Sequence, residues 1–178
     1  SSGIGKATAR ALSKKGIQLI LCGRRKEKLE ELQKELEVKS TILVFDVSDR
    51  HAVFKAVDSL PLGFKDIDIL VNNAGFAIYG SIFDLSIDEI ESQMETNYFG
   101  MVYCTKNFLP LMLEKKSGHI VNVASVAASF GLPGIASYCA SKFAMLGFSE
   151  GLKHELAGTG VGVTVVSPIM VKTDFFNH

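Results

Sequence analysis

Length, composition and charge exclude several classes of protein. The 178 residues, 47% of them hydrophobic, suffice for one soluble domain with a substantial core. The 19 basic and 19 acidic residues balance to a formal net charge of zero, so no overall charge favours nucleic acid or an anionic membrane as partner. No stretch is long enough to span a bilayer, and three separated cysteines favour reduced thiols in a cytoplasmic setting. These observations leave open whether a membrane anchor precedes residue 1.

The chain begins with a glycine-containing turn that leads into a helix. Residues 6–15 are rich in helix formers, and Gly16 stands where a left-handed C-cap is expected. The apolar run 17–23 then predicts a buried strand. Such a turn, helix and strand form half of a dinucleotide-binding unit, because bare glycine backbone lets N–H groups approach a pyrophosphate. We assign five residues of the turn to cofactor binding: Ser1, Ser2, Gly3, Ile4 and Gly5.

Short apolar runs alternate with helical segments along the rest of the chain. Strands separated by helical crossovers make a parallel sheet with helices on both faces. The fold class predicted is therefore α/β, a doubly wound parallel sheet of the Rossmann type, with residues 1–178 forming a single domain. Further strands are expected at 41–47, 67–71, 119–125 and 161–168, and further helices at 25–37, 51–60, 87–115 and 137–157.

The end of the second strand of a dinucleotide fold selects the cofactor. An acidic residue there binds the ribose hydroxyls, whereas arginine accommodates a 2′-phosphate. Here the strand is followed by Arg24 and Arg25 and by no acid. A planar guanidinium pairs bidentately with phosphate, so the sequence predicts NADP(H). Ordinary surface arginines at a helix start are the alternative.

Two later strand ends add candidates for the cofactor site. Asp46 and the adjacent Val47 follow the next strand, where Asp46 could accept a hydrogen bond from the adenine amino group or N-cap the helix that starts near Asp49. Residues 72–75, with the sequence NNAG, follow the strand after that, and their small side chains leave the backbone bare for a ligand, unless they form only a tight turn. The candidates here are Asn73, Ala74 and Gly75.

The second half of the chain contains a candidate proton-transfer site. Tyr138 and Lys142 lie four residues apart on an expected helix, so they share one face, and Ser125 ends the preceding strand. A neighbouring ammonium is expected to lower the pKa of the phenol, which suits an acid/base near neutral pH. The serine hydroxyl can hold a carbonyl oxygen that the tyrosine protonates while a nicotinamide delivers hydride to carbon.

Together these motifs resemble the short-chain dehydrogenase/reductase family over essentially the whole chain. SSGIG resembles the end of its glycine-rich turn, NNAG stands unchanged, and Ser125, Tyr138 and Lys142 match its catalytic triad. The resemblance implies that Asn97 holds a water in a proton relay. It also implies that the segment after the last expected strand meets the nicotinamide, through Pro168, Val171 and Thr173. This chain has Ile169 where the family usually has glycine.

The resemblance carries further expectations. The family's first strand lies in the middle of the sheet, so we expect a strand before residue 1, whose absence leaves two unpaired edges, and a substrate-covering loop and strand after residue 178. The implied function is an NADP(H)-dependent oxidoreductase, such as a carbonyl reductase, that interconverts a ketone or aldehyde and an alcohol. A non-catalytic NADP(H) sensor is the alternative. The two long helices imply a homodimer or homotetramer.

The histidines, one further cysteine and several aromatic residues are also candidates for function. The histidines lack metal-ligand spacing, so no metal is assigned. Cys139 projects away from the face of its tyrosine neighbour and is expected to pack as a small hydrophobe. An apolar substrate wall, or ordinary loop packing, is expected of Phe130, Pro133, Phe175 and Phe176.

Overall fold

The structure is a computed structural model that describes residues 1–169 and 171. Within them, parallel strands form two sheets. Strand β1 (Leu19–Gly23) pairs with β2 (Ser40–Val44), and β4 (Gly118–Val123) lies between β3 (Ile69–Asn72) and β5 (Val161–Val166). All of these pairings are parallel, as the alternation of apolar runs and helices predicts.

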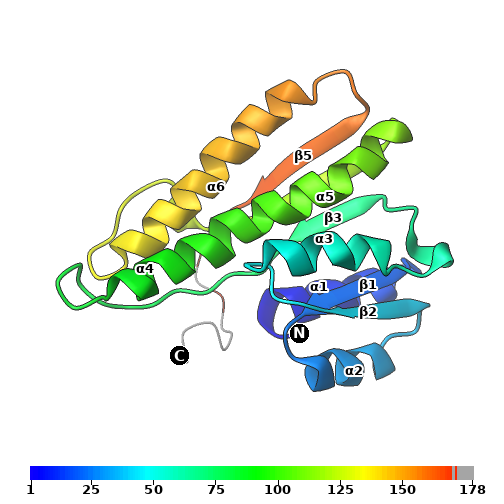
Figure 1. Cartoon of the computed structure of the whole chain (residues 1–178), viewed down its shortest axis with the longest axis horizontal. Coiled ribbons are helices and arrows are strands. Elements are labelled where there is room, and N and C mark those ends of the chain that lie inside the picture. Colours follow the sequence, from blue (N-terminus) through cyan, green and yellow to red (C-terminus); the bar gives the residue numbers. More distant parts are fainter. Residues whose placement is uncertain (170, 172–178) are drawn as a thin grey trace.

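Helices connect the strands in the predicted order (Figure 1). The first begins at Gly3, earlier than expected, and Gly16 has the predicted positive φ, of 76°. The segment expected as one helix over 87–115 contains a π-helical turn between two α-helices. The helices are α1 (Gly3–Ser13), α2 (Lys26–Lys34), α3 (Arg50–Asp58), α4 (Ile87–Met94), α5 (Gly100–Glu114) and α6 (Ala136–Glu155), with short turns η1 (Leu62–Phe64), η2 (Glu95–Phe99) and η3 (Val126–Ala128).

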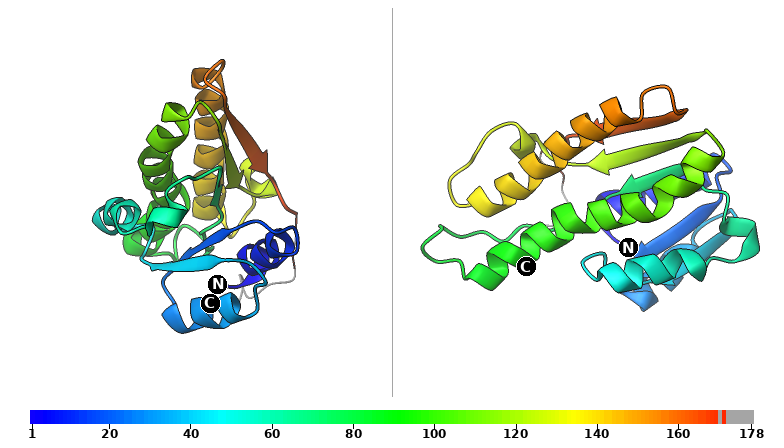
Figure 2. Two further views of the ribbon diagram at one scale, coloured as in Figure 1. Left: turned by 90° about the vertical axis from the view of Figure 1, so that its right-hand side faces the viewer. Right: turned by 45° about the horizontal axis from the view of Figure 1, so that its top comes forward.

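Apolar side chains gather in two main clusters on opposite faces of the strands. The larger cluster joins α3, α5 and α6 to the strands, with Val53, Met112 and Ile120 fully buried. The smaller cluster packs α1 and α2 against the other face of β1 and β2, around Leu29 and Leu32. Figure 2 (left) shows α5 and α6 on one side of the strands and α1 on the other. The doubly wound arrangement is therefore present, with its two helical layers.

No backbone pairing joins β1 to β3 within the described residues. The two sheets are therefore not hydrogen-bonded to each other in this part of the chain. Side chains on the face of the three-stranded sheet away from α5 and α6 are open to solvent, with Ile69 46% and Val166 43% exposed. The parallel strands all point the same way, so their carboxyl ends form one edge, where the site residues gather.

Candidate active site

The glycine turn lies against the NNAG segment. A Cβ at Gly5 would lie 2.8 Å from Nδ2 of Asn73, so a larger residue there would displace the Asn73 side chain. Gly3 has a positive φ of 52°, which glycine adopts without strain. Beside the turn lies a hollow of about 220 Å³, lined by Ser1, Ser2, Gly3, Lys6, Lys28 and Glu31. The turn therefore offers bare backbone and nearby cations, which suit an anionic ligand.

The two arginines after β1 point to different partners. Arg25 donates from Nη2 to the hydroxyls of Ser1 and Ser2, at 3.1 and 3.0 Å. Arg24 forms an ion pair with Asp46, with Nη1 3.4 Å from Oδ2. The structure thus places one guanidinium on the glycine turn and a second one on Asp46, after β2. Whether they bind a phosphate stays a prediction.

Asp46 does not cap a helix, so that alternative was wrong. Its Oδ1 accepts hydrogen bonds from the backbone N–H and the hydroxyl of Ser48, at 3.0 and 2.8 Å. Asp49 caps α3 instead, because its Oδ1 accepts from the N–H groups of His51 and Ala52. Burial raises the pKa of Asp46, but the bonds from Ser48 and the charge of Arg24 outweigh it and hold that pKa below its ordinary value. Asp46 is therefore an anion fixed at the sheet edge.

Val47 lies beside Asp46 and packs against α5. A side chain at Gly100, the first residue of that helix, would clash with the Val47 side chain, at 2.6 Å from Cγ2. The contact fixes the loop after β2 on the start of α5. Ala74 is exposed in the NNAG segment, as a ligand-facing residue requires.

Gly75 leaves room for two buried polar side chains. A Cβ on it would lie 2.9 Å from Oδ1 of Asn97 and 3.5 Å from Nζ of Lys142. Asn97 is fully buried, and Lys142 is 3% exposed. The NNAG segment, α6 and the π-helical turn therefore meet at one point, where a side chain on Gly75 would crowd Asn97.

Asn97 lies in that π-helical turn and joins two segments. Its Oδ1 accepts from the N–H of Phe76, and its Nδ2 donates to the carbonyl oxygen of Phe76 and to the hydroxyl of Ser141, each at 2.9 Å. Ser141 in turn donates to the carbonyl oxygen of Tyr138 at 2.7 Å. The side chain of Asn97 is thus occupied by protein partners, and its relay role stays a prediction. Such π turns occur often at functional sites.

Tyr138 and Ser125 lie next to each other, and the expected pKa shift of the tyrosine was wrong. Burial raises the pKa of the Tyr138 phenol above its ordinary value, and a hydrogen bond with Ser125 offsets only part of that rise. Lys142 is not among the causes of the shift, and its Nζ lies 5.8 Å from the centroid of the ring. Tyr138 is therefore a protonated phenol at neutral pH, held at the carboxyl end of β4.

Lys142 is buried against the backbone of the same strand. Its Nζ donates to the carbonyl oxygen of Val123 at 3.1 Å and lies 3.4 Å from Sδ of Met145. Burial lowers the pKa of Lys142 to about 8. The site thus holds a cation that sheds its proton unusually readily, beside a phenol that retains its own.

The segment after β5 passes the proposed proton-transfer site. The carbonyl oxygen of Pro168 accepts from the N–H of Val126, next to Ser125, at 3.1 Å. Ile169 is 80% exposed, and Val171 is exposed too. Phe130 is 47% exposed, on the loop before α6. Pro133 is also exposed there, so the loop offers an apolar surface whose substrate role stays a prediction. Thr173, Phe175 and Phe176 lie outside the described residues.

Sequence reasoning missed Gln93 and Ser141, both buried beside the site. Each stands at helical spacing from a recognised residue, Gln93 four before Asn97 and Ser141 three after Tyr138. Polar residues on the buried face of a helix were the available signal, since such groups need partners. Cys139 is buried among Ala77, Ala127 and Tyr138, in agreement with the packing interpretation.

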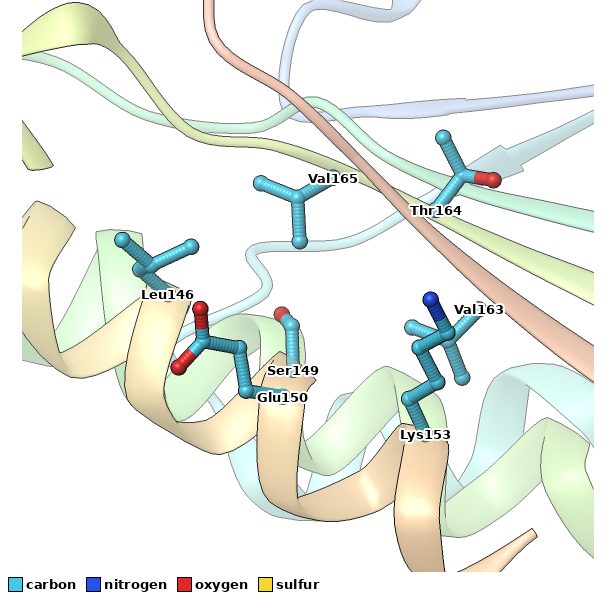
Figure 3. A pocket seen from close by; sticks show the side chains of 7 residues that line it. All are labelled: Leu146, Ser149, Glu150, Lys153, Val163, Thr164 and Val165. Carbon is cyan, nitrogen blue, oxygen red and sulfur yellow. The ribbon is translucent and has the colours of Figure 1, made fainter. Parts of the chain in front are cut away.

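A second pocket lies away from these residues. It measures about 290 Å³ between α6 and β5, and Figure 3 shows Leu146, Glu150 and Lys153 on its helical side. No proposed site residue lines it. In residues 1–169 and 171, no cluster of His, Cys, Asp or Glu could hold a metal ion, and no helix is long and apolar enough to cross a membrane. Self-association of the chain stays a prediction.

Comparison with known proteins identifies the relatives of this chain. The profile described as short chain dehydrogenase matches residues 1–178. The chain is 38% identical to bovine (Bos taurus) dehydrogenase/reductase SDR family member 7B, over 98% of this chain and 56% of that protein. It is 39% identical to the NADP-dependent 3-hydroxy acid dehydrogenase of Schizosaccharomyces pombe, over 98% of this chain and 70% of that protein. The chain thus spans little more than half the length of the bovine relative.

Solved structures share the fold. Serine dehydrogenase from Escherichia coli superposes with a TM-score of 0.89 at 38% identity, over 95% of this chain and 79% of that one. A closed form of serine dehydrogenase complexed with NADP⁺ superposes with a TM-score of 0.93 at 38% identity, over 99% of this chain and 72% of that one. The Rossmann-type fold predicted from the sequence is confirmed by these superpositions.

Proposed function

Because the chain belongs to the short chain dehydrogenase family, we propose that it forms the core of an NADP(H)-dependent oxidoreductase interconverting a ketone or aldehyde and an alcohol. The observation that carries the proposal is the meeting of Ser125, Tyr138 and Lys142 at one sheet edge, beside the glycine turn and NNAG. Relatives named for NADP-dependent activity and for an NADP⁺ complex support this cofactor.

The residues of the edge fit a dinucleotide. The bare backbone at Gly3 and Gly5 suits the pyrophosphate, and Arg25 on the glycine turn suits a 2′-phosphate, with Arg24 beside it. Asp46 offers a carboxylate acceptor for the adenine amino group. The remaining contacts are assigned to Val47, Asn73, Ala74, Gly75, Tyr138, Lys142, Pro168, Val171 and Thr173.

When bound, the nicotinamide supplies or accepts the hydride. The Ser125 hydroxyl donates a hydrogen bond to the substrate oxygen, and the Tyr138 phenol gives that oxygen its proton as the alcohol forms. The raised pKa of Tyr138 keeps the phenol protonated, which suits carbonyl reduction. Lys142, buried next to Gly75 and Asn97, is assigned to the ribose hydroxyls of the cofactor. Asn97 is assigned to hold a water behind Lys142, through which the proton given up by Tyr138 is replaced.

A Tyr138→Phe variant tests the proposal in the full-length natural protein. We expect turnover to fall by about 100- to 10,000-fold, because the proton donor is gone while the ring remains. NADPH affinity, followed by fluorescence titration, should stay within about threefold. Unchanged turnover would refute the role of Tyr138. NADPH binding by a wild-type protein that reduces no carbonyl compound would instead favour a nucleotide sensor.

The substrate panel follows from the relatives and from the site. It contains apolar aldehydes and ketones, with serine and 3-hydroxy acids offered in the oxidative direction together with NADP⁺. Serine and 3-hydroxy acids are included because two relatives are named as dehydrogenases of these compounds. The apolar carbonyls are included because Tyr79, which interacts with Tyr138, and Phe130, on the loop before α6, are exposed apolar side chains.

A further inference from the structure

Two buried amides on one helical face join the same pair of segments. Gln93 lies in the last turn of α4 and Asn97 lies one turn later in η2, and both are 0% exposed. Asn97 connects the loop after NNAG to α6 through Phe76 and Ser141. Gln93 makes the equivalent connection one turn away, so the two side chains form parallel links on either side of Tyr138.

All polar groups of the Gln93 side chain have partners. Its Oε1 accepts from the N–H of Ile78 at 3.0 Å, and its Nε2 donates to the hydroxyl of Ser137 at 3.0 Å and to the carbonyl oxygen of Glu89 at 3.2 Å. A buried amide is costly unless it is paired in this way. The link therefore holds one residue of the loop and one residue of α6 at fixed positions.

The segments joined by Gln93 surround the proposed proton donor. Ser137 directly precedes Tyr138 in the first turn of α6. The loop on the other side contributes Ala77, which packs against Tyr138, and Tyr79, whose charge interaction with Tyr138 contributes to the raised pKa of that phenol. The N–H of Gly80 donates to the carbonyl oxygen of Gly134 at 2.9 Å, which closes the loop onto the segment before α6. In Figure 1 the start of α6 lies beside α4.

We propose that Gln93 is a positioning residue for the reaction: it fixes the first turn of α6, and with it Tyr138, against the loop 76–80 that flanks the substrate. The inference rests on the proposed function, since it gives the tyrosine a task that depends on its position. Displacement of a reacting group by about 1 Å costs on the order of 100-fold in rate, so loss of this link should act on turnover.

Gln93→Met tests the inference in the full-length protein. Methionine keeps the length and shape of the side chain and removes the hydrogen bonds to Ile78 and Ser137. We expect kcat to fall about 10- to 100-fold while the NADPH dissociation constant, measured by fluorescence, stays within about threefold. We also expect the pH profile of kcat to shift, because the surroundings of the Tyr138 phenol change.

Ser137→Ala removes the contact on α6 alone and keeps the inference testable if Gln93→Met fails to fold. We expect a smaller loss of kcat, about 3- to 10-fold, and a double variant no slower than Gln93→Met by more than about twofold. The matched control is Asn107→Leu, since Asn107 is an amide that bonds a backbone carbonyl, that of Val53 at 2.6 Å, away from the site. It should lose thermal stability and keep kcat within about twofold.

Three outcomes would overturn the inference. The first is a folded Gln93→Met or Ser137→Ala variant whose kcat and pH profile match those of the wild type. The second is an equal loss of kcat in Asn107→Leu at equal loss of stability, which would make the effect a general one. The third is a wild type that turns over no carbonyl or alcohol of the panel, which removes the proposed function itself and is recognised by the wild-type measurement alone.

Discussion

Replacing Gly75 by alanine should loosen the site through a single methyl group. The added Cβ would lie 2.9 Å from Oδ1 of Asn97, closer than real Cβ contacts allow, and 3.5 Å from Nζ of Lys142. Asn97 has little freedom to retreat, because its amide makes three hydrogen bonds, two to Phe76 and one to Ser141, each at 2.9 Å. The methyl group must therefore either break one of these bonds or push the loop outward.

The expected cost follows from these contacts. A buried hydrogen bond lost to one partner costs about 1–3 kcal/mol, and overpacking costs a similar amount. The lower entropy of the unfolded alanine chain returns about 0.4–1 kcal/mol. We expect a net loss near 2 kcal/mol in the free energy of unfolding, which corresponds to a fall of about 4–8 °C in Tm for a chain of this length.

Thermal and denaturant unfolding of the wild type and of Gly75→Ala measure this difference in the free energy of unfolding directly. Gly147→Ala is the matched control, because its added Cβ meets nothing within 4 Å beyond its chain neighbours and the backbone of its own helix. It stands inside α6, where alanine is favoured over glycine by about 0.5–1 kcal/mol, so the control should gain stability. A Gly75→Ala protein as stable as the wild type would refute the close packing around Asn97.

Three further predictions concern charge. The folded pKa of Lys142, about 8, lies below the ordinary 10.5, so between these pH values the unfolded chain binds more protons and wild-type stability should rise with pH by up to about 3 kcal/mol. Lys142→Met should remove this rise. Parallel stability curves for the wild type and the variant would contradict the burial of the ammonium. Arg24→Ala and Arg25→Ala should each weaken NADPH binding about 10- to 100-fold in fluorescence titration and leave NADH binding within about threefold, and equal losses for both cofactors would refute the phosphate assignment. Asp49→Ala should lower the free energy of unfolding by about 1 kcal/mol through loss of the α3 cap, with kcat unchanged, and full stability in a denaturant titration would contradict capping.

The order of strands and helices could be predicted from local patterns. Apolar runs such as 17–23 and 161–168 differ clearly from the charged helix that contains Leu29 and Leu32, so periodicity was enough to place them. Gly16 marked the end of the first helix correctly because its φ of 76° suits glycine. The superpositions confirm the fold that these patterns predict.

The details of the site depend on contacts between distant segments, which local patterns do not encode. The sequence offered Asp46 as a possible helix cap, whereas Asp49, three residues later, caps α3; a difference of this size is within the error of helix boundaries read from sequence. The π-helical turn that turns Asn97 inward has no residue signature. The direction of the Tyr138 pKa shift depends on how deeply the phenol is buried, and the spacing of residues along a helix does not give that burial.

Transfer of an isotopic label tests the central claim most directly. NADPH deuterated at the reactive carbon of the nicotinamide is incubated with the full-length protein and the carbonyl panel, and the alcohols are examined by mass spectrometry. We predict that an alcohol product gains deuterium at its carbinol carbon in step with NADPH consumption, and that Tyr138→Phe forms almost none of it. Tight NADPH binding without label in any product of the wild type would contradict the assignment of these residues to carbonyl reduction.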